Sequence, residues 1–194
     1  MTKTLSRTAL AAALFALLFV PVSAADAYKV DGGHSTVMFK VNHLGFSHTY
    51  GRFNEIDGSA LIDEANASGS SISLSLDAGS VDTGNPPRDE HIRKADFLNA
   101  KEFPTITFKS KSVKKKGKVY EVAGELTLRG VTKSITVPMT RLETGNDPWG
   151  NERTGFDGSF TIERADYGVN YMPEGIGADV TMILSIELIK EKGE

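Results

Sequence analysis

Two neighbouring segments of the chain, residues 120–128 and 134–139, alternate between large apolar and polar residues. The apolar positions are Tyr120, Val122, Leu126 and Leu128 in the first segment and Ile135, Val137 and Met139 in the second. Because successive side chains of a strand point to opposite faces, each segment has one apolar face. Between them, Gly130 can adopt the positive φ that a tight reversal needs. The pattern therefore predicts a β-hairpin with one buried face.

Six further segments show the same alternation, which raises the number of expected strands to eight. They are residues 35–44, 50–62, 70–76, 105–112, 156–162 and 178–189. Eight antiparallel strands can close into a barrel whose interior holds side chains or one slim ligand, and closure removes exposed strand edges. An open sandwich is the alternative. The absence of regular strand–helix alternation argues against a parallel sheet. The expected fold class is therefore all-β, an antiparallel eight-stranded barrel.

One helix is expected, between the third and fourth of these strands. Asn85 can cap its N-terminus, and Pro86 suits the first turn, where no backbone N–H is missed. Asp89 complements the positive end of the helix dipole. The helical spacing of the apolar residues predicts that the helix ends near residues 96–99, before Pro104.

The N-terminal residues 1–24 have the pattern of a secretory signal peptide. Lys3 and Arg7 precede an apolar run over residues 9–20, which is too short to span a bilayer, and Ala24 offers a small residue at cleavage spacing. Cleavage after Ala25 or Ala27 also fits. We therefore expect export to the periplasm or the medium, a single domain over residues 25–194, and no transmembrane segment after cleavage.

Composition limits the partners of the exported chain. The chain contains no Cys, so its core must hold the fold without disulfides. Loss of Lys3 and Arg7 lowers the formal net charge of −3 by two units. An acidic total argues against nucleic acid, whose phosphates require a basic face.

The chain resembles the YceI-like family in many short motifs that occur in order. The matching pieces are Tyr28–Asp31, His34–Ser35, His43–Ser47, Gly51–Phe53, Ser80–Gly84, Arg88–Leu98, Phe103–Ser110, Gly124–Lys133 and Arg164–Gly168. Members of this family are exported bacterial proteins with a lipocalin-like barrel that bind polyisoprenoid-type lipids. The resemblance implies a binding protein for a long-chain lipid, such as a polyisoprenoid, a polyprenyl phosphate or a quinone. The resemblance implies that the protein requires no cofactor, and it is compatible with a homodimer.

The inward side chains of such a barrel are expected to line a lengthwise apolar cavity. The expected lining residues are Val37, Phe39, Val41, His43, Ile72, Leu74, Phe108, Val122, Gly124, Leu126, Val137 and Phe160. Gly124 removes a side chain from the wall and is expected to widen the cavity. The rival hypothesis is a stress-related structural barrel that is filled with its own side chains and has no dedicated ligand.

The polar residues that attract attention are histidines. His43 continues the inward phase of its strand, so it is either a core histidine or a polar contact for a lipid head group. Arg88, Asp89 and His91 are expected at the cavity mouth, with a contact between helix and barrel through Asp89, His91 and Asp96 as the alternative. No ligand spacing indicates a metal site, and no nucleophile is paired with a base, so we predict neither metal nor catalysis.

Overall fold

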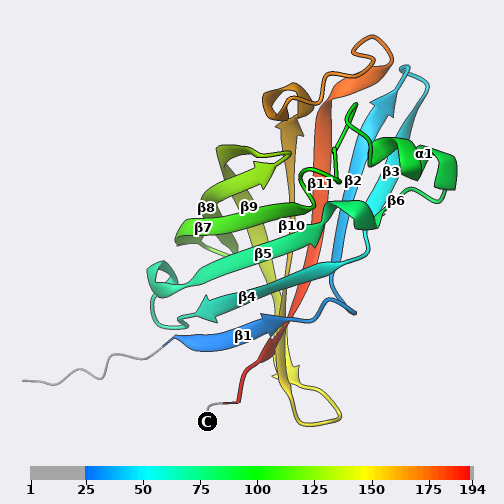
Figure 1. Ribbon diagram of the computed structural model, residues 1–194. Helices are drawn as coiled ribbons and strands as arrows, with labels where there is room; N and C mark the ends of the chain where they lie inside the picture. The colour runs from blue at the N-terminus through cyan, green and yellow to red at the C-terminus, as the bar shows by residue number, and fades with distance from the viewer. Residues whose placement is uncertain (1–24, 193–194) are drawn as a thin grey trace, which may run out of the picture.

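The computed structural model describes residues 25–192, which form one continuous sheet of eleven strands (Figure 1). The strands are β1 (Asp26–Val30), β2 (Thr36–His43), β3 (Ser47–Phe53), β4 (Ile56–Ile62), β5 (Ser71–Asp77), β6 (Val81–Asp82), β7 (Thr105–Lys116), β8 (Val119–Leu128), β9 (Val131–Asn146), β10 (Glu152–Glu163) and β11 (Ile176–Lys190). The helices are α1 (Pro86–Ile92) and the short 3₁₀ helices η1 (Ala67–Gly69), η2 (Ala78–Ser80) and η3 (Arg164–Tyr167). The signal peptide predicted for residues 1–24 lies outside the described residues.

Eight of the strands close into an antiparallel barrel, which is the predicted architecture. The ring includes β1, which was not predicted, and excludes β2, which corresponds to the predicted strand over residues 35–44. The ring runs β1-β4-β5-β7-β8-β9-β10-β11 and closes where β1 pairs with β11. The long strand β11 has two partners on this edge, because Leu188 faces Val30 of β1 whereas Leu184 faces Val37 of β2. Strands β2, β3 and β6 therefore extend the wall beyond the closed ring, toward the end where α1 lies (Figure 1).

The single strand predicted for residues 50–62 is wrong, because the structure divides this segment into β3 and β4. The break lies at Asn54 and Glu55, whose backbone N–H groups both donate to Ser80 Oγ at 3.1 Å. A side-chain acceptor thus replaces the strand partner at the break. Strand β3 continues the wall beside β2, whereas β4 pairs with β1 and β5.

The hairpin predicted from residues 120–139 is present as β8 and β9, with a tighter loop than the pattern indicated. Leu128 pairs directly with Val131, so only two residues connect the strands. Arg129 and Gly130 have φ values of 51° and 73°, the left-handed conformation that two-residue hairpins favour. The Arg129 guanidinium donates to the carbonyl oxygens of Gly168 and Ala95, which gives a physical reason for Arg at a position that usually suits Gly or Asn.

Helix α1 begins as predicted but ends earlier. Asn85 Oδ1 accepts from the Arg88 N–H at 3.1 Å, and the helix ends at Ile92 rather than near residues 96–99. The Arg93 guanidinium binds the carbonyl oxygens of Gly79 and Val81, which anchors the end of the helix on the barrel. The following turns fold back, because Ala100 N–H bonds to the Arg93 carbonyl. No helix within residues 25–192 has the length and apolar character needed to cross a bilayer.

The apolar core lies on the inner face of the barrel and includes the strands of the ring closure. Tyr28, Ile186 and Leu188 are each 1% exposed. The Tyr28 hydroxyl donates to Glu152 Oε1 at 2.9 Å, so its polar end remains satisfied. Burial, followed by the interaction with Glu152, raises the pKa of Tyr28 to about 12. The first and last strands are therefore fixed together by packing as well as by backbone pairing.

Candidate functional site

The barrel encloses an elongated cavity of about 480 Å³ with apolar walls. All the predicted lining residues except Gly124 contribute to it, namely Val37, Phe39, Val41, His43, Ile72, Leu74, Phe108, Val122, Leu126, Val137 and Phe160. These side chains come from β2, β5, β7, β8, β9 and β10. The inward phase that the alternation assigned to these strands is therefore the phase that surrounds the cavity, and the interior is not filled by side chains.

Gly124 does not widen the cavity. A Cβ atom at this position would lie 2.6 Å from Phe108 Cζ and 2.4 Å from the Lys109 carbonyl oxygen. The Phe108 ring therefore lies over the glycine and takes the space that a side chain would have filled. The Phe39 ring covers Gly51 in the same way, because a Cβ added at Gly51 would lie 2.4 Å from Phe39 Cζ. Glycine at these positions lets an aromatic ring lie close against the wall.

The end of the cavity at which α1 lies is called the mouth here. His43, Arg88 and His91 line the cavity there, as predicted. Asp89 does not line it. Its side chain is buried at 6% exposure, and its Oδ1 accepts from the Thr83 N–H at 2.8 Å and from Thr83 Oγ1 at 2.5 Å. Asp89 therefore fixes α1 to the segment after β6, which is part of the alternative role that the sequence left open.

An aromatic cluster covers one side of the mouth. The His91 ring meets Phe97 and Tyr171 edge-on, with centroid distances of 5.0 and 5.1 Å, and Phe97 and Tyr171 lie 5.1 Å apart. His91 Nε2 is also 3.0 Å from Asp96 Oδ2. Sequence reasoning missed Phe97 and Tyr171, because both lie in irregular segments where no periodicity indicates direction.

His43 lies exposed at the end of β2 and lines the mouth, so it is not a core histidine. Its neighbour across the sheet is Ile176, the first residue of β11. The ring is thus placed where it can meet both the cavity and the solvent. Whether it contacts a ligand stays a prediction.

The other end of the cavity carries an ion pair that sequence reasoning missed. Arg141 Nη2 lies 2.6 Å from Glu64 Oε1, and Arg141 Nε donates to Thr154 Oγ1 at 3.1 Å. The interaction with Arg141 holds the pKa of Glu64 below its usual value. Arg141 continues the inward phase of Val137 and Met139, so the phase of β9 was the available signal.

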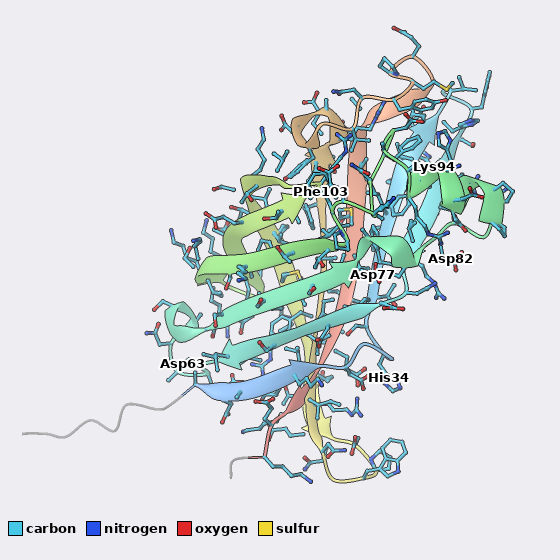
Figure 2. The ribbon with its side chains drawn as sticks, viewed as in Figure 1. His34, Asp63, Asp77, Asp82, Lys94 and Phe103 are labelled. Carbon is cyan, nitrogen blue, oxygen red and sulfur yellow. The ribbon has the colours of Figure 1, made fainter. Side chains whose placement is uncertain are left out.

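The two ends of the cavity are far apart in the molecule. Asp63, the neighbour of Glu64 in the sequence, lies at one side of Figure 2. Lys94, just after α1, lies at the other side. Both Asp63 and His91 line the cavity. The cavity is therefore an apolar slot with polar groups at each end.

Arg164 holds the segment that borders the mouth. Arg164 is 6% exposed, and its guanidinium donates to the carbonyl oxygens of Val169, Ile176 and Gly177 at 2.8 to 2.9 Å. Burial lowers the pKa of the Arg164 guanidinium. Because these three carbonyls flank residues 170–175, one side chain fixes both ends of the loop that carries Tyr171.

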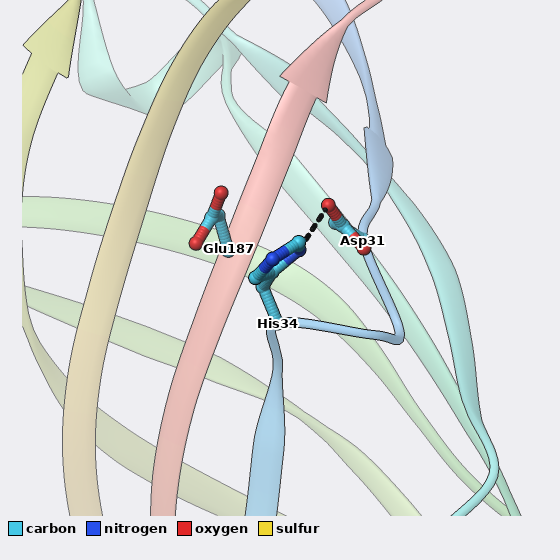
Figure 3. A group of neighbouring side chains, drawn as sticks. All are labelled: Asp31, His34 and Glu187. Atoms are coloured by element: carbon cyan, nitrogen blue, oxygen red, sulfur yellow. Dashed lines mark hydrogen bonds and ion pairs between the residues drawn. The ribbon is translucent and has the colours of Figure 1, made fainter. Parts of the chain in front are cut away.

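Three side chains of types that can bind metal ions lie together outside the barrel wall, away from the cavity. Asp31, His34 and Glu187 place one ligand atom each within 4.8 Å of one another (Figure 3). Arg153 already binds two of them, since its Nη1 is 2.6 Å from Asp31 Oδ2 and 2.5 Å from Glu187 Oε1. Its Nε also lies 2.7 Å from Asp147 Oδ2. A guanidinium thus compensates these carboxylates, and the arrangement is typical of a structural ion-pair network.

Replacing Arg153 with Met is expected to destabilise the protein at pH 7 and much less in acid. Burial opposes ionisation of Asp147 and Asp31, but hydrogen bonds from Arg153, together with those from Asn151 and Trp149 to Asp147 and from His34 and Gly33 to Asp31, outweigh it. They hold the pKa of each carboxyl below its usual value. A depressed pKa in the folded state gives stability above the ordinary Asp pKa of about 4, and this stability is lost as the pH falls. The difference between wild type and variant in urea unfolding should therefore begin to shrink near pH 4 and shrink further as the pH falls through the lowered pKa values of the two carboxyls.

Arg52→Met is the control for this prediction. Arg52 is 58% exposed and lies 4.0 Å from Asp82, so its removal should change stability little at either pH. A destabilisation by Arg153→Met that is equal at both pH values would contradict the role assigned to the carboxylates.

Comparison with known proteins agrees with the fold. Residues 28–188 match the family model described as the YceI-like domain. A UPF0312 protein of Pseudomonas paraeruginosa is 43% identical over 191 residues, which cover 97% of this chain and 98% of the relative.

Solved structures share the architecture. BcnA of Burkholderia cenocepacia superimposes with a TM-score of 0.75 at 25% identity, over 81% of this chain and 98% of that protein. A polyisoprenoid binding domain from Saccharophagus degradans, implicated in plant cell wall breakdown, superimposes with a TM-score of 0.66 at 20% identity, over 86% of this chain and 99% of that domain. The second likeness concerns the fold alone. On the family match and the identity of the curated relative, the chain belongs to the YceI-like family.

Proposed function

We propose that this protein is an exported lipid-binding protein that holds one long-chain isoprenoid-type lipid, a quinone or a polyprenyl phosphate, inside its barrel. Its role is carriage or storage of that lipid in the periplasm. The observation that carries the proposal is the apolar cavity of about 480 Å³ that runs between the mouth and the Arg141 end. The signal-peptide pattern of residues 1–24 supports the location.

The walls of the cavity suit a hydrocarbon chain. Ligand sites of roughly 300–1,000 Å³ with mainly apolar linings are usual for small molecules. Burial contributes about 25 cal/mol per Å² of apolar surface, so a long tail gains affinity without directional contacts. The rival hypothesis, a structural barrel without a ligand, requires an interior filled by side chains. The open cavity favours the lipid-binding hypothesis.

A binding role also fits better than an enzymatic one. The family includes proteins of this barrel architecture, and the fold neighbour from Saccharophagus degradans is itself described as a polyisoprenoid binding domain. Two of the charged groups that line the cavity have partners within the protein: Arg164 binds carbonyl oxygens, and Arg141 is paired with Glu64. These contacts position the wall and the loops, and we assign no reaction to them.

The polar end of the lipid lies at the mouth in this proposal. A polar head group buried among apolar walls would lack partners and cost a few kcal/mol. At the mouth, Arg88 donates to Thr83 and His91 lies 3.0 Å from Asp96, whereas His43 is exposed and lines the cavity. At the other end, Glu64 and Thr154 already occupy the Arg141 guanidinium. The tail therefore runs from the mouth toward Arg141.

A bulky side chain inside the cavity is expected to weaken lipid binding. Met182 lines the cavity between Phe39 and Phe160, its cross-strand neighbours. The variant Met182→Trp should lower the affinity for a fluorescent long-chain lipid by about tenfold or more, because it shortens the apolar slot. The affinity is measured by titration of lipid-free protein, followed by displacement with a quinone, a polyprenyl phosphate and a plain hydrocarbon.

Ile183→Trp is the matched control, since Ile183 is the next residue of β11 and is 37% exposed on the outer face. It should bind as the wild type does. Equal affinities of the two variants would show that the lipid does not enter the barrel. Native mass spectrometry of freshly purified protein, with no lipid-sized mass released, would favour the ligand-free structural barrel.

A further inference from the structure

We propose that the mouth of the barrel docks onto a lipid bilayer through an apolar rim, and that lipid passes directly between bilayer and cavity. The apolar rim is defined as Leu44, Phe46, Tyr171 and Met172. These side chains are exposed at 46%, 88%, 38% and 49%. Leu44 and Phe46 lie on the connection between β2 and β3, and the other two lie in the loop before β11. The inference rests on the proposed function, because a carrier of long lipids must exchange them with a membrane.

The rim is continuous and leads into the cavity. The Leu44 N–H donates to the Gly175 carbonyl at 2.8 Å, which joins the two loops. A Cβ at Gly175 would lie 2.6 Å from Met172 Cε and 3.3 Å from Leu44 Cδ2, so both side chains lie over this glycine. Tyr171 and Met172 are also cavity-lining residues. Leu44 and Met172 therefore lie together, and Met172 and Tyr171 connect the exposed loops with the interior.

Two rim residues adopt a backbone conformation that does not favour them. Leu44 has a φ of 53° and Met172 a φ of 49°. Residues with a Cβ rarely adopt this left-handed region, which suits Gly and Asn. Gly or Asn would relieve the strain and would also be more soluble at an exposed position. Large apolar side chains at these two exposed positions are therefore unfavourable for the protein alone in water, and contact with an apolar partner would offset this cost.

The partner that fits is a bilayer rather than another protein. Residues 40–54 include Lys40 and Arg52 and contain no carboxylate, whereas the other rim loop carries one exposed carboxylate, Glu174. A protruding apolar tip flanked by basic residues suits insertion beside lipid phosphates. In Figure 1 this connection projects at the same end as α1, whereas the connection between β9 and β10 projects at the opposite end. Docking would therefore place the mouth, and no other part of the barrel, against the membrane.

The test variant combines Leu44→Asn with Phe46→Ser. Neither residue lines the cavity, and Asn suits the positive φ of position 44, so the barrel should keep its thermal stability and its affinity for a fluorescent lipid. The probe is a vesicle of phosphatidylethanolamine and phosphatidylglycerol in a flotation assay. The wild type should float with the vesicles, and the variant should lose about tenfold or more in partition coefficient. Vesicles of phosphatidylcholine alone test the contribution of the basic residues.

The control is Trp149→Ser. Trp149 is 78% exposed in the connection between β9 and β10, and its removal should leave flotation unchanged. The proposal is overturned if the double variant floats as the wild type does, if the wild type does not float, or if Trp149→Ser loses as much as the double variant. It is also overturned by the following pair of results. Light scattering shows that the wild type is a dimer and the double variant is not, and the wild type does not float with the vesicles. A wild type that floats but binds no fluorescent lipid would contradict the proposed function and leave the docking surface in place.

Discussion

Replacing Leu126 with Asp is expected to unfold the barrel, whereas Asp at the adjacent Thr127 should leave it folded. Leu126 is 8% exposed and lies on the inner face of β8. A carboxylate there exchanges apolar burial for a charge without a partner, which costs roughly 4 kcal/mol or more. A domain of this size has only about 5–15 kcal/mol of stability, so most of it would be lost.

Thr127 provides the control on the opposite face of the same strand. Its hydroxyl is 2.8 Å from Thr132 Oγ1 across the hairpin, in an exposed position. Loss of that contact should cost about 1 kcal/mol. Far-ultraviolet circular dichroism and urea unfolding of both variants measure the difference. If the two variants lose the same stability, the inward phase assigned to β8 is wrong.

Replacing Arg164 with Met is expected to be the other severe substitution. It leaves three carbonyl oxygens, those of Val169, Ile176 and Gly177, without the donor that satisfies them. Each buried unsatisfied group costs about 1–3 kcal/mol, so a total of roughly 3 kcal/mol or more is expected. Urea unfolding measures the loss. Lys133→Met is the control, because Lys133 forms an exposed ion pair with Asp166 in the same 3₁₀ helix, η3.

Hydrogen exchange of the same variant shows whether Arg164 stabilises only the loop at the mouth or the whole barrel. Arg164 fixes the loop with Tyr171 and Met172, so this loop should lose protection first in hydrogen exchange of the Arg164→Met variant. Protection in β8 and β9 should fall less. A uniform loss across the barrel would show that Arg164 supports the whole fold rather than the border of the mouth.

The regular part of the fold could be predicted because a period of two in the sequence has a direct structural counterpart. The inward residues of β5, β8 and β9 line the cavity as the alternation indicated. Strand β1 was missed, because its five residues follow immediately after the expected cleavage site and are too few to show a period. Strand β6 has only two residues, Val81 and Asp82, and depends on its pairing with β3.

The candidate site was harder to predict, because its polar groups are placed by contacts between distant segments. Nothing local to Glu64 indicates that it meets Arg141, and Arg153 joins Asp31 and Glu187 only through the barrel. Gly124 was misread for a similar reason, since a missing side chain does not show which ring will take its space. Asp89 fitted both a mouth residue and a structural contact, and only its burial separates them.

Because β1 pairs with β11, the barrel can close only after the C-terminal strand has been synthesised. Tyr28 faces Lys190, so the ring cannot close before the last residues of the domain are available. Until then β1 can pair with β4 on one side, but its other edge has no partner and the sheet stays open. Contacts between such distant parts of a sequence form slowly. A closed interior therefore exists only after the whole domain has been synthesised, and only then can the cavity enclose a ligand.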